Sequence, residues 1–341
     1  MTEPAFTRPA FTRRRLLAGS ALAIAGSLAG SLVLAGAPAP ALAQNATIII
    51  GKDGWLFPGW ESLSVLDRAG ITANVGLLQE TKTALAARGI ALVTAVVPLK
   101  ANFYKERLPD GTAVSADVSG QYDFILGELK KAGIDTVDLR PALKSVQTGR
   151  QTSFYRADYH WTAWASEAAA EAVAQAIKAR IPKLAGGAGG DKLGEWVTQR
   201  HLGDLAERFL TPDQQKQIGP DLYTVRTPPA AKSSLLDSGA APVHIVGNSF
   251  VQPYLGFPQK LSNALDRPVS LTWNPGNVGP WATFLQYVGS PDFAKAPPQV
   301  IVWQFNEGPF HSGPQSTDQW DAPSIMSPQA WRDRMLAAVR R

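Results

Sequence analysis

Cysteine is absent from the 341-residue chain, which excludes disulfides, a thiol nucleophile and any metal held by thiolates. Histidine is scarce, with four residues, and His201, His244 and His311 lack the spacing of metal ligands. We therefore expect neither a catalytic metal nor another cofactor. The chain also lacks a long basic run, which argues against nucleic acid as a partner. Of its 33 basic and 28 acidic residues, four arginines and one glutamate lie within residues 1–43, so the remainder has a net charge of only +2.

Only one uncharged apolar run is long enough to span a bilayer, and it covers residues 16–37. Paired arginines at 13–15 precede it, and Ala41-Leu42-Ala43 follows as a cleavage signal of the A-x-A type. This pattern predicts a twin-arginine signal peptide over residues 1–43 and a mature protein in the periplasm. An uncleaved membrane anchor is the alternative.

Strand and helix patterns alternate along the rest of the chain. Strands are predicted at 90–97, 134–139, 243–248, 269–273 and 300–305, of which 90–97 and 243–248 are apolar runs. Helical spacing and capping residues predict helices at 72–88, 118–132, 162–180, 254–266, 281–288 and 328–340. A short hairpin is expected around the turn at Lys52-Asp53-Gly54. Such alternation is typical of an α/β fold with a mostly parallel central sheet.

Residues 184–241 do not continue the alternation of strand and helix patterns. They begin with a glycine-rich stretch, and their periodicity is weak up to Pro242. We expect residues 44–341 to form a single catalytic domain in which about 184–241 are an insertion, with a lid as one possible role.

Two short motifs carry acyl-transfer chemistry. Ser249 follows the apolar run 243–248 and stands two residues after Gly247, where a strand breaks into a helix and exposes the hydroxyl. His160 has Asp158 two residues before it, and in an extended loop these two side chains point to the same side. Ser249 would attack an acyl carbonyl, His160 would take its proton, and Asp158 would orient the imidazole. Each motif alone is equally compatible with an ordinary turn or a structural hydrogen bond.

Such chemistry also requires an oxyanion hole. After the strand at 269–273, Asn274, Gly276 and Gly279 can present backbone N–H groups, and after the strand at 300–305 the amide of Asn306 can donate. Ordinary loop glycines and a turn asparagine are the alternative. The shared position of these residues, at the ends of strands that follow the serine strand, favours function.

Together these blocks resemble those of SGNH hydrolases, with the Asp-His block before the serine instead of last. This permuted order, with Gly51-Lys52-Asp53-Gly54-Trp55-Leu56-Phe57, Val97-Pro98-Leu99-Lys100 and the Asp-x-His-Trp-Thr motif at 158–162, resembles the periplasmic alginate O-acetyltransferases of the AlgJ/AlgX group. The resemblance implies a three-layer SGNH-like fold, an acetyl-Ser249 intermediate and transfer to hydroxyls of an exopolysaccharide. It also implies a membrane-bound O-acyltransferase as the partner that donates the acetyl groups.

Two other functions use the same residues. A carbohydrate acetyl esterase would use the triad with water as acceptor, and a polysaccharide-binding component of a secretion complex would not use it at all. For sugar contact the candidates are tryptophans near the site, two or three of which we expect to reach ligand: Trp55, Trp60, Trp161, Trp164, Trp273, Trp281 and Trp303. Lys100 and Tyr104 follow a strand end, and for Lys100 we expect a solvated side chain.

Overall fold

The computed structural model describes residues 48–149, 151–186, 188–228 and 241–340. The predicted signal peptide, residues 1–43, lies outside the described residues, as do residues 229–240 of the predicted insertion. Among the described helices, none is both long and apolar enough to cross a membrane.

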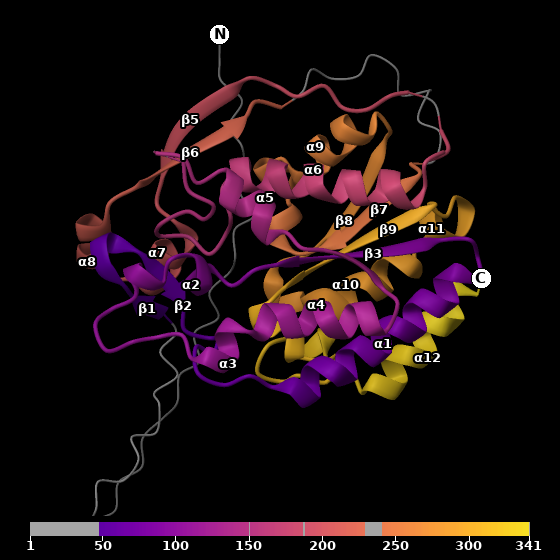
Figure 1. Ribbon diagram of the computed structural model, residues 1–341, viewed down its shortest axis with the longest axis horizontal. Coiled ribbons are helices and arrows are strands. Elements are labelled where there is room, and N and C mark those ends of the chain that lie inside the picture. Colours follow the sequence, from indigo (N-terminus) through magenta and orange to yellow (C-terminus); the bar gives the residue numbers. More distant parts are fainter. Residues whose placement is uncertain (1–47, 150, 187, 229–240, 341) are drawn as a thin grey trace, which may run out of the picture. The chain divides into compact units, whose positions relative to one another are not determined.

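Five parallel strands form the central sheet, in the order β4-β3-β9-β7-β8 (Figure 1). Strands β7 (Val243–Gly247) and β9 (Val300–Asn306) are buried along their whole length, as is β3 (Ala91–Val97) after its first residue. Burial on both faces explains why these strands read as continuous apolar runs. The edge strands β4 (Asp135–Val137) and β8 (Val269–Trp273) are less buried.

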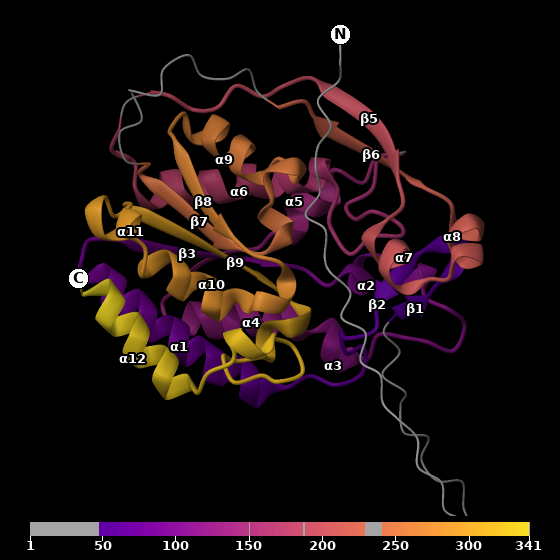
Figure 2. The same ribbon diagram turned by 180° about the vertical axis from the view of Figure 1, so that it is seen from behind.

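Helices cover both faces of the sheet, and successive side chains of β3 point into two separate cores. Val93, Ala95 and Val97 belong to one core, whereas Leu92 and Val96 belong to the other. The first core contains side chains of α5 (Arg140–Ser145), α6 (Ala163–Arg180) and α9 (Phe257–Leu265). The second contains side chains of α1 (Arg68–Ala86), α4 (Gln121–Lys131), α10 (Gly279–Val288) and α12 (Pro328–Val339). Figures 1 and 2 show these two helical layers from opposite sides, and the predicted three-layer α/β fold is confirmed.

Shorter elements complete the fold. The hairpin predicted at Lys52-Asp53-Gly54 is confirmed, because β1 (Ile48–Ile50) pairs antiparallel with β2 (Leu56–Pro58) around a 3-10 turn at Lys52–Gly54. The other short helices are α2 (Lys100–Phe103), α3 (Ala116–Ser119) and α11 (Pro291–Lys295). Further 3-10 turns lie at Lys105–Arg107, Ser249–Val251, Pro253–Leu255, Gly276–Val278, Gly308–His311 and Ala322–Ser324.

The segment whose fold the sequence left open contains an antiparallel hairpin with two helices between its strands. Strands β5 (Trp196–His201) and β6 (Asp221–Arg226) pair with each other, and α7 (Asp204–Phe209) and α8 (Pro212–Ile218) connect them. A capping box at Thr211 begins α8. This segment packs on the rest of the fold at three places, because β6 contacts α6 and the 3-10 turn at Pro253–Leu255, and α7 contacts β2.

Strand order determines where the candidate residues meet. The last strand, β9, lies between β3 and β7, so the carboxyl ends of these three strands are adjacent. Pro98, Asn306 and Ser249 stand at or directly after those ends. Residues far apart in the sequence are thereby brought to one edge of the sheet.

Candidate active site

Ser249 lies on a tight turn at the end of β7. Asn248 caps the 3-10 turn there, its side chain accepting a hydrogen bond from the backbone N–H of Phe250 at 3.0 Å. Gly247 is required by close packing, because a Cβ atom at this position would come within 2.7 Å of both Gln304 Oε1 and a methyl group of Val251. The sharp exit from the strand leaves Ser249 partly exposed.

The structure brings Ser249, His160 and Asp158 together in one hydrogen-bonded row. Ser249 Oγ lies 2.7 Å from His160 Nε2, and His160 Nδ1 lies 2.7 Å from Asp158 Oδ1. The loop that carries His160 is closed by a hydrogen bond from the backbone N–H of Tyr155 to the carbonyl of His160. With Nδ1 donating to Asp158, His160 Nε2 is left as the acceptor for the serine proton.

The charges of Asp158 and His160 stabilise each other. Burial lowers the pKa of the His160 imidazole, but the negative charge and hydrogen bond of Asp158 outweigh it, so the pKa lies above its ordinary value. Burial likewise opposes ionisation of Asp158, but His160 and neighbouring donors hold the pKa of that carboxyl well below its usual range. Asp158 is therefore a carboxylate in a site that is nearly closed to water.

Four donors around Asp158 explain how a buried carboxylate is tolerated. Its Oδ1 atom accepts from both the backbone N–H and Nδ1 of His160. Its Oδ2 atom accepts from the hydroxyl of Tyr223 at 2.5 Å and from the backbone N–H of Asp204 at 3.1 Å. Tyr223 lies on β6 and Asp204 begins α7, so the segment inserted after α6 supplies half of these donors. Sequence reasoning missed both residues, since no periodicity or motif marks them.

Asp158, His160 and Asp204 offer oxygen and nitrogen atoms within 4.8 Å of one another, a spacing that can hold a metal ion. Hydrogen bonds already occupy both oxygens of Asp158, both ring nitrogens of His160 and one oxygen of Asp204, however. Asp158 accepts its four donors, and Asp204 Oδ1 accepts from the backbone N–H of Tyr159 at 2.8 Å. Burial and the charge of Asp158 also raise the pKa of Asp204 to about 6, which weakens it as a ligand at acidic pH. The donor pattern fits a hydrogen-bonded charge network better than a metal site.

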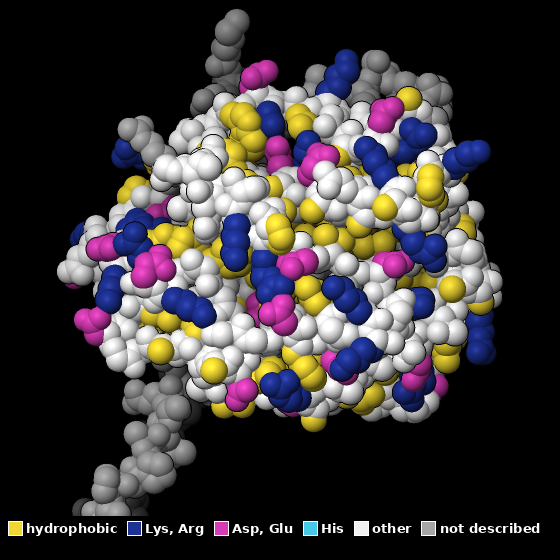
Figure 3. Space-filling view, viewed as in Figure 1, with side chains coloured by type: hydrophobic (Ala, Val, Ile, Leu, Met, Phe, Trp, Pro, Cys, Tyr) yellow, Lys and Arg dark blue, Asp and Glu magenta, His cyan; other side chains and the backbone are white. Residues whose placement is uncertain are grey.

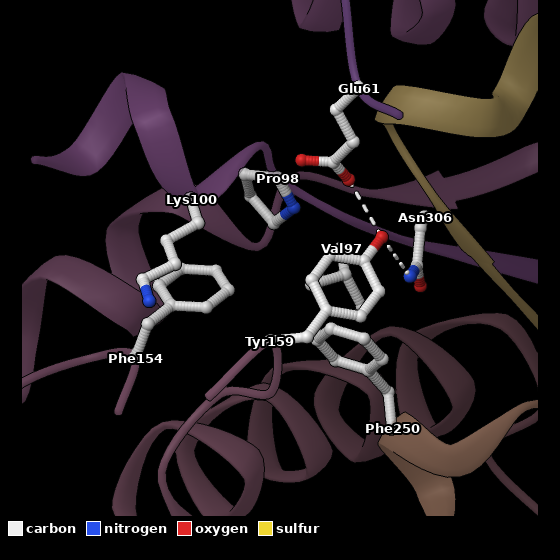
Figure 4. Close-up of a pocket in the computed structure, with 8 residues that line it drawn as sticks. All are labelled: Glu61, Val97, Pro98, Lys100, Phe154, Tyr159, Phe250 and Asn306. Atoms are coloured by element: carbon white, nitrogen blue, oxygen red, sulfur yellow. Dashed lines mark hydrogen bonds between the residues drawn. The ribbon is translucent and has the colours of Figure 1, made fainter. Parts of the chain in front are cut away.

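Asn306 ends β9 beside the serine turn. Its amide oxygen accepts from Gln304 Nε2 at 2.7 Å and from Asn248 Nδ2 at 3.3 Å, and these two bonds orient the amide. Its Nδ2 atom donates to the hydroxyl of Tyr159 at 2.9 Å, and that hydroxyl donates to Glu61 Oε1 at 2.7 Å (Figure 4). Asn306 is thus connected to the serine turn on one side and to the histidine loop on the other.

The side chains of this region, shown in Figure 4, leave no room for a water molecule between them. Ligand pockets usually enclose about 300–1,000 Å³, so this region is not the acceptor site. Its lining residues are Glu61, Val97, Pro98, Lys100, Phe154, Tyr159, Phe250 and Asn306. Burial raises the pKa of Glu61 to about 7, against the opposing hydrogen bond from Tyr159 and the charge of Lys100. Glu61 was not found from sequence because it lies in a loop without a recognisable motif.

The loop after β8 is only partly placed at the site. The backbone N–H of Asn274 donates to the carbonyl of Gly247 at 3.3 Å, next to the serine turn, whereas its side chain donates away from it, to Thr283 and Gln286. Gly279 has a φ of +76° and lies against the ring of Trp320, so packing and backbone conformation explain this glycine. Gly276 has open space where a side chain would be.

Two residues near the triad are buried rather than exposed. Trp161 is fully buried, stacks on Phe257 and donates from Nε1 to the carbonyl of Phe250 at 2.9 Å, so it supports the serine turn from the core instead of facing substrate. The expectation of a solvated Lys100 is wrong. Its side chain is buried, and its ammonium donates to the carbonyls of Leu56, Arg156 and Asp158. Burial lowers the pKa of Lys100 to about 7, opposed by the charges of nearby aspartates.

Comparison with known proteins agrees with this geometry. Residues 48–307 match a family model described as an SGNH hydrolase-like domain, acetyltransferase AlgX. The chain is 30% identical to the probable alginate O-acetylase AlgJ of Pseudomonas aeruginosa over 317 residues, which cover 86% of this chain and 78% of that protein. It is 29% identical to the Pseudomonas fluorescens protein of the same name, over 76% of this chain and 67% of the relative. The solved O-acetyltransferase domain of Pseudomonas putida AlgJ aligns with a TM-score of 0.68 and 28% identity, covering 85% of this chain and 98% of that domain.

Proposed function

The chain belongs to the AlgX family of SGNH hydrolase-like acetyltransferase domains, and on that premise we propose that it is an O-acetyltransferase acting on an alginate-like exopolysaccharide. The observation that carries the mechanism is the row from Asp158 through His160 to Ser249, in which both side-chain distances are 2.7 Å. The relatives' name supports acetyl as the group transferred.

The reaction takes place in two steps through a covalent ester. In the first, Ser249 Oγ attacks the carbonyl of an acetyl donor while its proton passes to His160 Nε2. The tetrahedral intermediate collapses, and the leaving group takes that proton, which leaves acetyl-Ser249. In the second step, an acceptor hydroxyl gives its proton to His160 and attacks the ester, and Ser249 departs with the proton. Asp158 stabilises the imidazolium in both steps.

Asn306 is the best supported oxyanion donor. Its amide nitrogen carries two hydrogens, and the bond to the Tyr159 hydroxyl uses one of them. The second is available to the oxygen of the tetrahedral intermediate at the serine turn. Gly276, Gly279 and Asn274 stay predictions, with the backbone of Asn274 next to the turn.

The cellular setting is part of the proposal. The twin-arginine pattern before residue 44 supports export to the periplasm, where a secreted polysaccharide would be the acceptor. A membrane-bound O-acyltransferase would donate acetyl groups to Ser249. Residues 44–341 would act as one catalytic domain with its insertion at about 184–241.

One experiment separates transfer from hydrolysis. The purified full chain is incubated with p-nitrophenyl acetate as donor and a panel of oligosaccharides, and products are followed by mass spectrometry. Acetylated sugar supports the proposed transferase, free acetate alone supports an acetyl esterase, and turnover that does not depend on Ser249 refutes both. Ser249→Ala is the test variant, and Ser145→Ala, on the exposed end of α5, is the matched control.

A further inference from the structure

We infer that Tyr159 and Glu61 are positioning residues, which hold the amide of Asn306 so that its free N–H faces the tetrahedral intermediate. This inference rests on the proposed function, because it concerns the acylation step of that reaction. It is carried by a hydrogen-bonded chain from the Asn306 amide through the Tyr159 hydroxyl to Glu61, which joins three segments that are distant in sequence.

The oxygen end of the Asn306 amide is held by the serine turn. It accepts from Gln304 Nε2 at 2.7 Å and from Asn248 Nδ2 at 3.3 Å. Gln304 Oε1 in turn accepts from the backbone N–H of Asn248 at 3.0 Å, and Asn248 directly precedes the nucleophile. The last side-chain torsion of asparagine has broad minima, so contacts at the oxygen alone do not fix the nitrogen end.

The nitrogen end is held by Tyr159. Asn306 Nδ2 donates to the Tyr159 hydroxyl at 2.9 Å, and that hydroxyl donates to Glu61 Oε1 at 2.7 Å (Figure 4). Burial and the nearby Glu61 carboxyl raise the pKa of Tyr159 well above its ordinary value, so the hydroxyl keeps the proton that it donates. Because this hydrogen is directed at Glu61, the phenol oxygen presents a lone pair to Asn306 instead of a competing hydrogen. Glu61 thus sets the direction of the chain, and Tyr159 binds one of the two amide hydrogens.

Tyr159 is itself fixed at its backbone and at its ring. Its backbone N–H donates to Asp204 Oδ1 at 2.8 Å. Its ring packs edge-on against Phe250, the residue after Ser249, with centroids 5.0 Å apart, and edge-on against Trp60 at 5.5 Å. The hydroxyl is therefore held at a constant place relative to the serine turn, as a preorganised oxyanion hole requires.

Glu61 is held closely as well. It is buried, and a Cβ atom at Gly308 would lie 2.5 Å from Glu61 Oε1, so its carboxyl packs against the segment that follows Asn306. The side chains of this region leave no room for a water molecule between them. The three groups of the chain therefore contact one another directly rather than through water.

Surface charge on the face shown in Figure 3 is mixed in sign, with described basic and acidic side chains interspersed. Such a face adds little to the electrostatic potential at a developing oxyanion. Stabilisation of the intermediate then depends on donors that are placed individually within the site.

The test measures the acylation step alone, as the burst of p-nitrophenolate released when the full chain reacts with p-nitrophenyl acetate. Asn306→Ala, which removes the oxyanion donor, should lower the maximal acylation rate by about 10²-fold to 10³-fold. Tyr159→Phe keeps the ring and removes the hydroxyl, and we expect it to lower this rate by roughly 10-fold. The ester concentration that gives half of the maximal rate should stay within about 2-fold, because the lost interaction acts in the transition state.

A double-mutant cycle separates positioning from a general structural role. If Tyr159 acts through the amide of Asn306, Tyr159→Phe should change the acylation rate by less than about 2-fold in the Asn306→Ala background. A loss of roughly 10-fold in both backgrounds would show that Tyr159 acts independently of the amide, and would overturn the inference.

Tyr122→Phe is the matched control. The Tyr122 hydroxyl is also buried, donates to the Val96 carbonyl at 2.8 Å and accepts from the Leu139 N–H at 3.2 Å, but it makes no bond to the Asn306 amide. We expect this variant to acylate at the wild-type rate. A loss in Tyr122→Phe as large as that in Tyr159→Phe would assign the effect to a buried hydroxyl in general and contradict the inference.

Glu61 provides a second measurement that does not require Tyr159→Phe to fold. Glu61→Gln retains an oxygen that can accept from the Tyr159 hydroxyl, whereas Glu61→Ala does not. We therefore expect Glu61→Gln to keep more of the acylation rate than Glu61→Ala. Equal rates in these two variants would contradict the positioning role of Glu61.

Failure of this inference can be distinguished from failure of the proposed function, because acylation precedes the choice of acceptor. A wild-type acylation rate in Tyr159→Phe overturns the inference and leaves the transferase proposal intact. If the wild type forms acetyl-Ser249 but acetylates no oligosaccharide, the transferase proposal fails and the variant rates still decide the inference. If the wild type forms no acetyl-Ser249, both fail.

Discussion

Glu307 tests whether a buried carboxyl group beside Asn306 keeps its proton in the folded protein. It follows Asn306, its side chain is 1% exposed, and its Oε2 atom accepts from the backbone N–H of Leu99 at 2.6 Å. Its Oε1 atom is buried without a partner among the described residues. Burial raises the pKa of Glu307 from 4.5 to about 8, with the Leu99 hydrogen bond opposing this shift. The folded protein therefore keeps a proton on Glu307 that the unfolded chain releases near its ordinary pKa.

This difference makes stability depend on pH in a definite direction. A raised folded-state pKa stabilises the native protein fully below pH 4.5, and that contribution is lost as the pH rises through about 8. Between about pH 5 and pH 9 the loss is roughly 4 kcal/mol as an upper bound, from 1.36 kcal/mol for each pKa unit. Glu307→Gln removes the titration, yet its amide oxygen can still accept from the Leu99 N–H.

We expect Glu307→Gln and the wild type to have similar free energies of unfolding near pH 5, and the variant to be the more stable at pH 9. Urea unfolding followed by tryptophan fluorescence at pH 5, 7 and 9 measures the difference. Glu106→Gln, at an exposed carboxylate, is the control for general effects of charge. A stability difference that stays the same from pH 5 to pH 9 would show that Glu307 does not hold its proton in the folded state.

Four further predictions concern the catalytic row and its support. Because the pKa of His160 lies above its ordinary value and the base must be neutral, kcat/KM for ester turnover should fall as the pH decreases through that raised pKa. Asp158→Asn should lower kcat by about 10³-fold to 10⁴-fold and move this acid limb to lower pH; a limb that does not move would assign the titration to another group. Tyr223→Phe should lower kcat by about 10-fold and move the limb to higher pH, because the remaining carboxylate interacts more strongly with the imidazolium. Lys100→Met should destabilise the protein by roughly 2–4 kcal/mol in urea unfolding, since three buried carbonyls lose their donor, and an unchanged midpoint would contradict that role.

Sequence alone predicted the elements whose signal is local. Strands β3, β7 and β9 were visible because burial on both faces requires continuous apolar runs, and the alternation of strands with helices then predicted the parallel sheet. Ser249, His160 and Asp158 are individually ordinary, and they could be named because the serine ends a strand before a helix and the Asp-x-His pair lies in a loop before another helix. Their proximity follows from β9 lying between β3 and β7, a long-range pairing that no local pattern encodes.

The surroundings of the site were not predictable in the same way. Lys100 has the sequence context of a solvated lysine after a strand, and only the fold shows the three carbonyls that converge on its ammonium. Glu61 and Asp204 likewise look like surface residues in the sequence. A buried charge is tolerated only where hydrogen-bond partners from several segments meet. No periodic pattern in the sequence marks such partners.

The donors of Asp158 also bear on the role of the segment that follows α6. Tyr223 and Asp204, from β6 and α7, provide two of the four hydrogen bonds to this carboxylate, whose side chain is otherwise enclosed. If that segment opened as a lid, Asp158 would lose both donors while still facing the imidazole, and the pKa values of the pair would change with each opening. During catalysis one proton passes back and forth between Ser249 and His160. This transfer is favoured when the electrostatic environment of His160 stays the same throughout the cycle. We therefore expect β6 and α7 to move together with the Asp158–His160 loop and to act as a fixed wall of the active site.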